Sequence, residues 1–120
     1  MTAARNEQAV TLRRLLPDAD SLTADEAAER WQLDRRAPRG RPHVALNMVA
    51  TVDGRASVGG RTAPISSIAD RQFFHALRTR VDAVMVGAGT LRTERYGRLV
   101  PDPHRREQRV AAGLAADPLA

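Results

Sequence analysis

Residues 43–52 read HVALNMVATV, and this is the most strand-like stretch of the sequence. It is almost continuously apolar and contains several β-branched residues, which is typical of a strand buried on both faces of a sheet. The pair Asp53-Gly54 that follows is a strong turn former, so residues 55–58 are expected to run back as a short strand. The sequence therefore predicts a sheet whose best-defined strand is residues 43–52.

The segments that follow alternate between helix and strand patterns. Ser66 and Ser67 predict the start of a helix, because apolar residues recur at helical spacing after them. Residues 82–86, DAVMV, predict a second buried strand, and a short polar helix is expected over residues 91–95. The order strand, helix, strand, short helix predicts an α/β fold with parallel neighbours.

The predicted sheet lacks cover. A parallel pair of strands must be covered on both faces, and two strands with one well-patterned helix cannot supply this cover. The sequence therefore predicts a sheet that is incomplete in this chain. Residues 104–112 are expected to add a surface helix, capped by Gly113.

Composition changes near residue 40 and divides the chain in two. Residues 1–40 are expected to form a leader with one helix, since Thr23 and Glu26 have the spacing of a capping box. The sequence RRAPRG at 35–40 is expected to be a linker, because Pro and Gly break helices. Residues 41–120 would then form the strand-rich part.

Composition also excludes several kinds of chemistry. The 120 residues suit one small domain, and 42% of them are apolar. Cysteine is absent, which excludes disulfides, thiolate zinc sites and cysteine nucleophiles, and all 19 basic residues are Arg, which excludes a phosphate-loop lysine. No apolar run approaches the roughly 18 to 20 residues that cross a bilayer. With no secretory signal pattern either, a cytoplasmic location is expected.

The charge lies mainly in the second part of the chain. Residues 1–40 hold seven Arg and seven acidic residues, whereas residues 41–120 hold twelve Arg and seven acidic residues. An excess of this sign attracts anions such as phosphates, although a GC-rich genome also places Arg on solvated surfaces. Nucleic-acid binding is not expected, because aromatic stacking residues are nearly absent from the basic part.

Gly87-Ala88-Gly89-Thr90 lies between a predicted strand and a predicted helix. Small residues at such a turn let a ligand approach the backbone, whose free N–H groups attract an anion. A tight turn without a ligand explains the pattern equally well. The third glycine of a dinucleotide fingerprint is replaced by Arg92, so this is not that motif.

A second group of polar residues follows the first strand. Asn47, Thr51 and Asp53 alternate along its end and should face one side. Ligands of open α/β sheets bind beyond the carboxyl ends of the strands, which places this group beside the Gly87 turn if the strands are parallel neighbours. A turn-forming role for Asp53 and a core amide role for Asn47 are the alternatives.

A third group could bracket a phosphorylated sugar. Thr62 and Ser66 offer hydroxyls at a helix start, and Arg78 offers a counter-charge. Helix capping and a surface Arg explain the same residues, and the residues alone favour that explanation. The three His residues lack metal-ligand spacing, so no metal site is expected, and no catalytic acid or base is assigned.

Two stretches carry a family resemblance. PHVALNMVATVDGRASVGG at 42–60 and ISSIADRQFFHALRTRVDAVMVGAGTLRTERYG at 65–97 resemble the riboflavin-biosynthesis pyrimidine reductases. These form the reductase domain of the bifunctional deaminase-reductase. The resemblance implies a dihydrofolate-reductase-like fold with a mixed, mostly parallel sheet and flanking helices. It covers roughly residues 41–120, which would be the N-terminal half of that domain.

The resemblance also implies a cofactor and its contacts. NADPH would deliver a hydride to the sugar C1′ of a ribosylaminopyrimidine 5′-phosphate. The backbone of Val49 and Ala50 would lie against the nicotinamide. Thr90, together with Gly87 and Gly89 of its turn, would contact NADPH. Glu94 would do so as well, where the family usually has Asp.

The resemblance implies that Thr62 and Arg78 lie on the side of the substrate. It also matches Asp53 to the Asp of the family's S-x-D-G motif. Residues 93–99 depart from the family's D-D-P-x-L-T-x-R pattern, so a pterin or folate on the same fold is an alternative substrate. The other alternative is a small basic polyanion-binding module without catalysis. A complete domain would be expected to form a homodimer.

Overall fold

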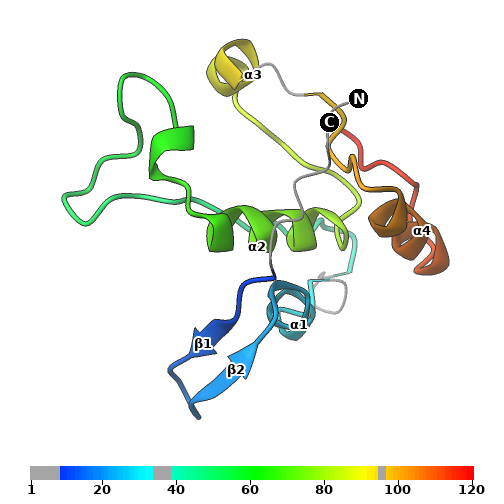
Figure 1. The fold of residues 1–120 in the computed structure, drawn as a ribbon. Helices are drawn as coiled ribbons and strands as arrows, with labels where there is room; N and C mark the ends of the chain where they lie inside the picture. The colour runs from blue at the N-terminus through cyan, green and yellow to red at the C-terminus, as the bar shows by residue number, and fades with distance from the viewer. Residues whose placement is uncertain (1–8, 34–38, 95–96) are drawn as a thin grey trace, which may run out of the picture.

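The computed structural model of the chain describes residues 9–33, 39–94 and 97–120. Two short strands come first and the helices follow them, so the described residues mix α and β structure (Figure 1). The elements in chain order are β1 (Leu12–Arg14), β2 (Asp20–Leu22), α1 (Ala24–Arg30), the 3₁₀ turn η1 (Ala63–Ile65), α2 (Ile68–Arg78), α3 (Ala88–Glu94) and α4 (Pro103–Ala111).

The sheet found among the described residues is a hairpin in the leader. β1 and β2 pair antiparallel, with Leu12 opposite Leu22 and Arg14 opposite Asp20. The Asp20 carboxylate lies 2.8 Å from Nε of Arg14 and 2.9 Å from Nη1 of Arg30, so it ties the hairpin to the end of α1. This hairpin was not predicted, because each strand is only three residues long and carries no clear alternation.

The expected helix of the leader is confirmed, together with its capping box. The Thr23 hydroxyl accepts from the backbone N–H of Glu26 at 3.2 Å, and the Glu26 carboxylate accepts from the backbone N–H of Thr23 at 2.7 Å. These reciprocal bonds satisfy donors that a helix start leaves without an intrahelical partner. The linker predicted at 35–40 lies largely outside the described residues, and Gly40 adopts a positive φ of 73° at its end.

The main packing contact joins α1 to α2. Helix α2 starts after Ser67, whose hydroxyl accepts from the N–H of Asp70 at 3.1 Å, as predicted from the serines. The rings of Trp31 and Phe73 meet edge to face, with centroids 5.2 Å apart. The buried core between the two helices is small and consists of Ala24, Ala28, Ala76 and Leu77.

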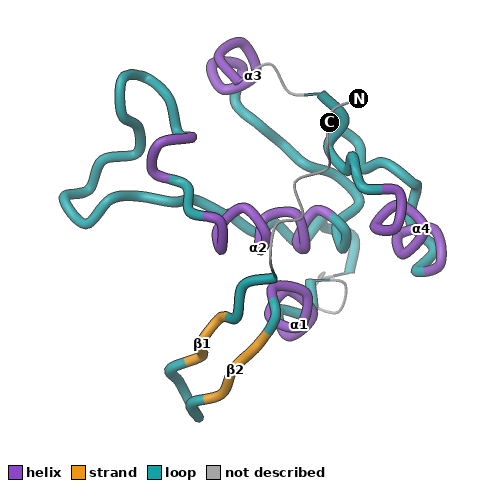
Figure 2. Tube along the Cα trace, in the orientation of Figure 1, coloured by secondary structure: helices purple, strands orange, loops and turns teal. Residues whose placement is uncertain are grey.

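The predicted strand at 43–52 is wrong for this structure. The whole segment is an open loop (Figure 2), and residues 55–58 likewise form no strand. Val44, Leu46 and Met48 are 74%, 77% and 67% exposed. A strand needs a neighbour to bond its backbone and a layer to cover its apolar face, and the described residues offer this segment neither. The prediction identified an apolar segment correctly, but it assigned a strand where the structure has a loop.

The second predicted strand is reduced to a single parallel bridge. Ala83 pairs with Leu119, since the N–H of Val84 donates to the carbonyl of Leu119 at 2.8 Å and the N–H of Leu119 donates to that of Asp82 at 3.0 Å. The mostly parallel sheet expected from the sequence is therefore not formed by the described residues. Met85, just beyond the bridge, is 92% exposed.

A buried arginine joins the end of α2 to α4. Arg109 has no exposed surface, and it donates from Nη1 to the carbonyls of Arg78 at 2.6 Å and Val81 at 2.8 Å, and from Nε to that of Ala115 at 2.8 Å. Helix α4 matches the predicted helix at 104–112, and Gly113 follows it with φ 80° as expected. Helix α4 is therefore not only a surface helix, because its residue Arg109 is buried among these three carbonyl groups.

Candidate functional site

The glycine turn at 87–90 is open to ligands. Helix α3 begins at Ala88, three residues earlier than predicted, and the N–H of Leu91 bonds the carbonyl of Gly87 at 3.0 Å. Neither Gly87 nor Gly89 has a positive φ, and a Cβ on either would meet no described atom within 4 Å. Neither backbone conformation nor packing among the described residues therefore explains the glycines. Close approach of another molecule would explain them.

Thr90 follows the two glycines on the first turn of α3. It is half-buried, whereas Gly87 and Gly89 are exposed. The backbone of Glu94 ends α3, and its side chain lies outside the described part of the chain. The turn therefore combines exposed backbone with one hydroxyl, and both are groups that can hydrogen-bond an anion.

Asp53 belongs to a self-contained polar turn. The Thr51 hydroxyl donates to the Asp53 carboxylate and accepts from the N–H of Arg55 at 3.0 Å. Arg55 Nε lies 3.3 Å from the other Asp53 oxygen, and Gly54 takes a φ of 82°. The turn-forming role considered for Asp53 is thus present. Its side chain is 65% exposed and can still meet a ligand.

The residues expected around the nicotinamide lie on the loop at 43–52. Val49 and Asn47 are half-buried, and Ala50 is exposed. In Figure 1 this loop and α3 extend from different sides of α2, so the described structure does not bring the two expected halves of the cofactor site together.

The residues expected on the substrate side are also separated. Ser66 precedes α2, and its hydroxyl donates to the Asp70 carboxylate at 2.7 Å. Arg78 ends the same 11-residue helix, which places it about 16 Å away along the axis. Thr62 lies before η1 and is exposed. One small phosphate cannot contact Ser66 and Arg78 together in this arrangement.

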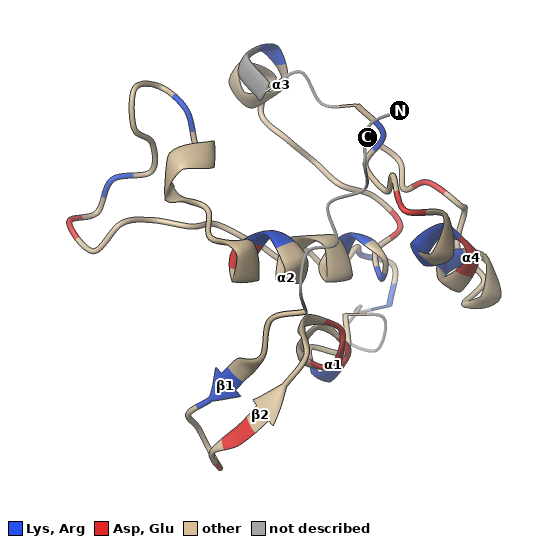
Figure 3. Cartoon of the chain, viewed as in Figure 1, with Lys and Arg blue, Asp and Glu red and all other residues tan. Residues whose placement is uncertain are grey.

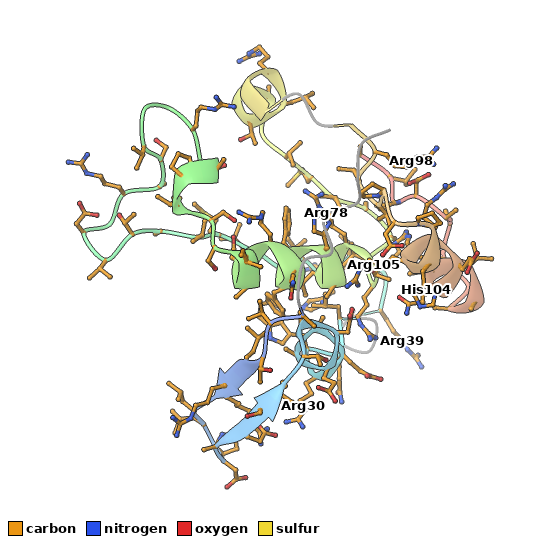
Figure 4. All side chains as sticks on the ribbon, viewed as in Figure 1. Arg30, Arg39, Arg78, Arg98, His104 and Arg105 are labelled. Atoms are coloured by element: carbon orange, nitrogen blue, oxygen red, sulfur yellow. The ribbon has the colours of Figure 1, made fainter. Side chains whose placement is uncertain are left out.

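Arg78 is buried, so the surface Arg that the residues alone favour is wrong. It is 6% exposed, its guanidinium lies 3.9 Å from the centroid of the Phe74 ring, and its Nη1 donates to the carbonyl of Leu99 at 3.2 Å. Figure 4 shows this side chain at the C-terminal end of α2. Its contacts hold the segment after α3 against α2.

Two cavities that the sequence did not indicate flank α2. One of ≈ 180 Å³ is lined by His75, Asp102 and Arg105, among others, and Arg105 reaches from α4 to the Asp25 carboxylate at 2.6 and 3.1 Å (Figure 4). The other, of ≈ 510 Å³, lies between the β1–β2 hairpin and the two helices, beside Trp31 and Phe73. Both depend on packing between segments distant in sequence, which no local pattern reveals.

Basic residues are spread over the loop at 39–61 and over α2, α3 and α4 (Figure 3). Burial lowers the pKa of the Arg109 guanidinium below its ordinary value, with Asp82 and Asp117 opposing the effect. Within residues 9–33, 39–94 and 97–120, no group of three potential metal ligands occurs. The helices of the same ranges include none that is long and apolar enough to span a membrane.

Comparisons with known proteins define the class. The family model of the RibD C-terminal domain matches residues 42–118, so the chain belongs to that family, and the predicted membership among the riboflavin-biosynthesis reductases is confirmed. The 2,5-diamino-6-ribosylamino-4(3H)-pyrimidinone 5′-phosphate reductase of Methanothermobacter thermautotrophicus is 34% identical over 79 residues. The match covers 66% of this chain and 33% of the relative, so the chain spans about a third of the relative's length. No solved structure matches.

Proposed function

We propose that this chain contributes part of an NADPH-dependent reductase site that acts on a ribosylaminopyrimidine 5′-phosphate in riboflavin biosynthesis. The observation that carries the proposal is the family match over residues 42–118, which includes the open turn at 87–90. The relative is named for reducing a substrate of this class. NADPH would supply the hydride, and the proposed acceptor is the sugar C1′.

The proposed cofactor contacts divide between two segments. The turn residues Gly87, Gly89 and Thr90 would hold a phosphate of NADPH through backbone N–H groups and a hydroxyl, and Glu94 would lie nearby. Val49 and Ala50 would offer an apolar surface to the nicotinamide. Because the described structure holds these segments apart, binding would have to draw them together, or further polypeptide would have to do so.

The proposed substrate contacts are Asn47, Asp53, Thr62, Ser66 and Arg78. The exposed Asp53 carboxylate would accept a hydroxyl of the sugar, and the hydroxyls of Thr62 and Ser66 would face its phosphate. Arg78 could join them only after leaving Leu99. We place the complete domain in the cytoplasm, in a dihydrofolate-reductase-like fold and as a homodimer.

The test of the cofactor proposal is an amide NMR titration of the chain with NADPH. The amides of Gly87, Gly89 and Thr90 should shift with a saturable dependence on NADPH. Thr90→Val should weaken binding about tenfold, because a hydrogen bond to a charged phosphate is lost. Leu91→Ala, an exposed change on the same helix, is the matched control and should bind as the parent does.

The substrate proposal is tested separately by mixing the chain with NADPH and the ribosylaminopyrimidine phosphate and following NADPH oxidation. Dihydrofolate in place of that substrate tests the alternative. A titration in which the turn amides ignore NADPH would contradict the cofactor assignment for this chain. Turnover of dihydrofolate alone would keep the cofactor assignment and replace the substrate.

A further inference from the structure

The cavity of ≈ 510 Å³ between the β1–β2 hairpin, α1 and α2 has the size of a site for a small organic molecule. Its apolar lining includes Leu12, Leu16, Leu22, Ala27, Trp31 and Phe73. None of the proposed cofactor or substrate contacts lines it. Most of its lining comes from residues 12–31, which lie outside the family match at 42–118. The cavity is therefore distinct from the proposed reductase contacts.

Two aromatic rings line this cavity. The rings of Trp31 and Phe73 meet edge to face with centroids 5.2 Å apart, and Trp31 is still 39% exposed. Leu16, on the hairpin, is 81% exposed. Covering such apolar surface is favourable, and an aromatic group gains further from contact with the rings. The apolar part of the cavity therefore fits a flat ring system.

Arginines line the same cavity and give it a positive charge. Arg14 and Arg30 share one carboxylate, since Arg14 Nε and Arg30 Nη1 lie 2.8 and 2.9 Å from the two oxygens of Asp20. Figure 4 shows Arg30 beside β2. Arg13 is a third lining guanidinium, and Asp70 is the carboxylate of the lining. Three guanidiniums and the two carboxylates of Asp20 and Asp70 leave one positive charge in excess.

Arg14 and Arg30 also have hydrogen-bond donors to spare. Arg14 donates to the carbonyl of Asp18 through Nε, and Arg30 donates to Asp20 through Nη1. Within residues 9–33, 39–94 and 97–120, the other guanidinium nitrogens of these two residues make no hydrogen bond. A guanidinium presents five N–H donors in a planar fork that matches a carboxylate. The side chains of Arg14 and Arg30 are 30% and 47% exposed, so an anion can reach both.

We propose that this cavity binds a small aromatic acid. Its flat ring system lies against Trp31 and Phe73, and its carboxylate accepts hydrogen bonds from Arg14 and Arg30. The excess positive charge selects an anion over a neutral or cationic molecule, and the aromatic lining selects a ring over an aliphatic chain. A ligand in this position contacts the hairpin, α1 and α2 together and holds the leader against α2. The inference does not rest on the proposed reductase activity.

Trp31 provides the signal for the test. The sequence holds one tryptophan, so its indole N–H gives a single signal in an NMR spectrum of the chain. Titration with naphthalene-2-carboxylate should shift this signal with a saturable dependence on concentration. Naphthalene-2-carboxamide has the same rings without the charge and should bind about tenfold more weakly, because it lacks the charged hydrogen bonds. Acetate has the charge without the rings and should leave the signal in place.

Two lining variants locate the site. Arg30→Gln should weaken binding of the carboxylate about tenfold and leave binding of the carboxamide unchanged, which also shows that the cavity remains folded. Ala27→Leu places a larger side chain in the cavity and should abolish binding of both compounds. Arg92→Gln changes an exposed residue of α3 that does not line the cavity, and this matched control should bind both as the parent does.

Three results would overturn the proposal. An indole signal that ignores the carboxylate would show that the cavity takes no ligand of this class. Equal affinities of the parent chain for the carboxylate and the carboxamide would show that the arginines do not select an anion. Undiminished binding of the carboxylate to the Ala27→Leu chain would place the compound elsewhere on the surface.

Discussion

Arg109 is the residue whose removal should cost the most. Its guanidinium donates to three backbone carbonyls from two other segments, and each carbonyl would be left without this donor after Arg109→Met. Orphaned buried acceptors cost roughly 1 to 3 kcal/mol each, so we expect a loss of about 3 kcal/mol in the free energy of unfolding. Urea denaturation followed by circular dichroism measures it.

Two variants separate the geometry of this side chain from its charge. Arg109→Lys keeps the charge but replaces the planar fork by one ammonium, and it should recover less than half of the loss. Arg92→Met removes an exposed Arg from α3 and should change the free energy of unfolding by no more than about 0.5 kcal/mol. Equal effects of Arg92→Met and Arg109→Met would disprove the special role of the buried guanidinium.

Glu26 gives the stability of α1 a defined pH dependence. The backbone N–H and then the hydroxyl of Thr23 donate to its carboxylate and lower the pKa of Glu26 below its ordinary value of 4.5. A carboxylate whose pKa is lowered in the folded state contributes its full stabilisation of the fold above about pH 4.5. This stabilisation is lost as the pH falls through the lower, folded pKa. The melting temperature should therefore fall as the pH is lowered from the ordinary pKa of Glu26 to its folded pKa.

Glu26→Gln should remove this part of the acid sensitivity while keeping a side chain that can bond the cap. The matched control is Glu29→Gln, an exposed change on the same helix but outside the capping box. A Glu26→Gln chain with the acid profile of the parent would show that the capping box is not the source.

The contact between α1 and α2 contains a fluorescent reporter. Trp31 is the sole tryptophan of the sequence, and its ring meets that of Phe73. Phe73→Leu should alter the tryptophan emission and lower the free energy of unfolding by about 1 to 2 kcal/mol. Phe74→Leu changes the neighbouring ring, which contacts Arg78 instead, and should leave the emission unaltered.

The helices could be predicted because their signals are local. Thr23 with Glu26, Ser67 with Asp70, and Gly113 each satisfy or terminate backbone groups within a few residues, so the sequence pattern contains the interaction itself. The strands could not be predicted in the same way. An apolar segment such as 43–52 becomes a strand only with a pairing partner, and the partner is not encoded in the segment.

The candidate site shows the same division. The open glycine turn and the polar turn at Asp53 were predicted from their own residues, and both occur. Their expected meeting at one sheet edge depends on the parallel sheet, which the described residues do not form. The burial of Arg78 against Phe74 and Leu99 depends on segments far along the chain, so no local pattern could distinguish it from a surface Arg.

The proposed homodimer should make the stability of the protein depend on its concentration. A dimer that forms only from folded chains stabilises them by mass action, so the melting temperature should rise with protein concentration. Calorimetry over a hundredfold range of concentration measures this rise, and a constant melting temperature would contradict the proposed dimer.

The joint at Arg109 also has a consequence for synthesis on the ribosome. Its acceptors at Arg78 and Val81 are made first, the donor follows about thirty residues later, and Ala115 comes last. The carbonyls at the end of α2 therefore stay open to water until residues up to Ala115 have been translated. The α1–α2 core can form before that point, whereas the docking of α4 comes later.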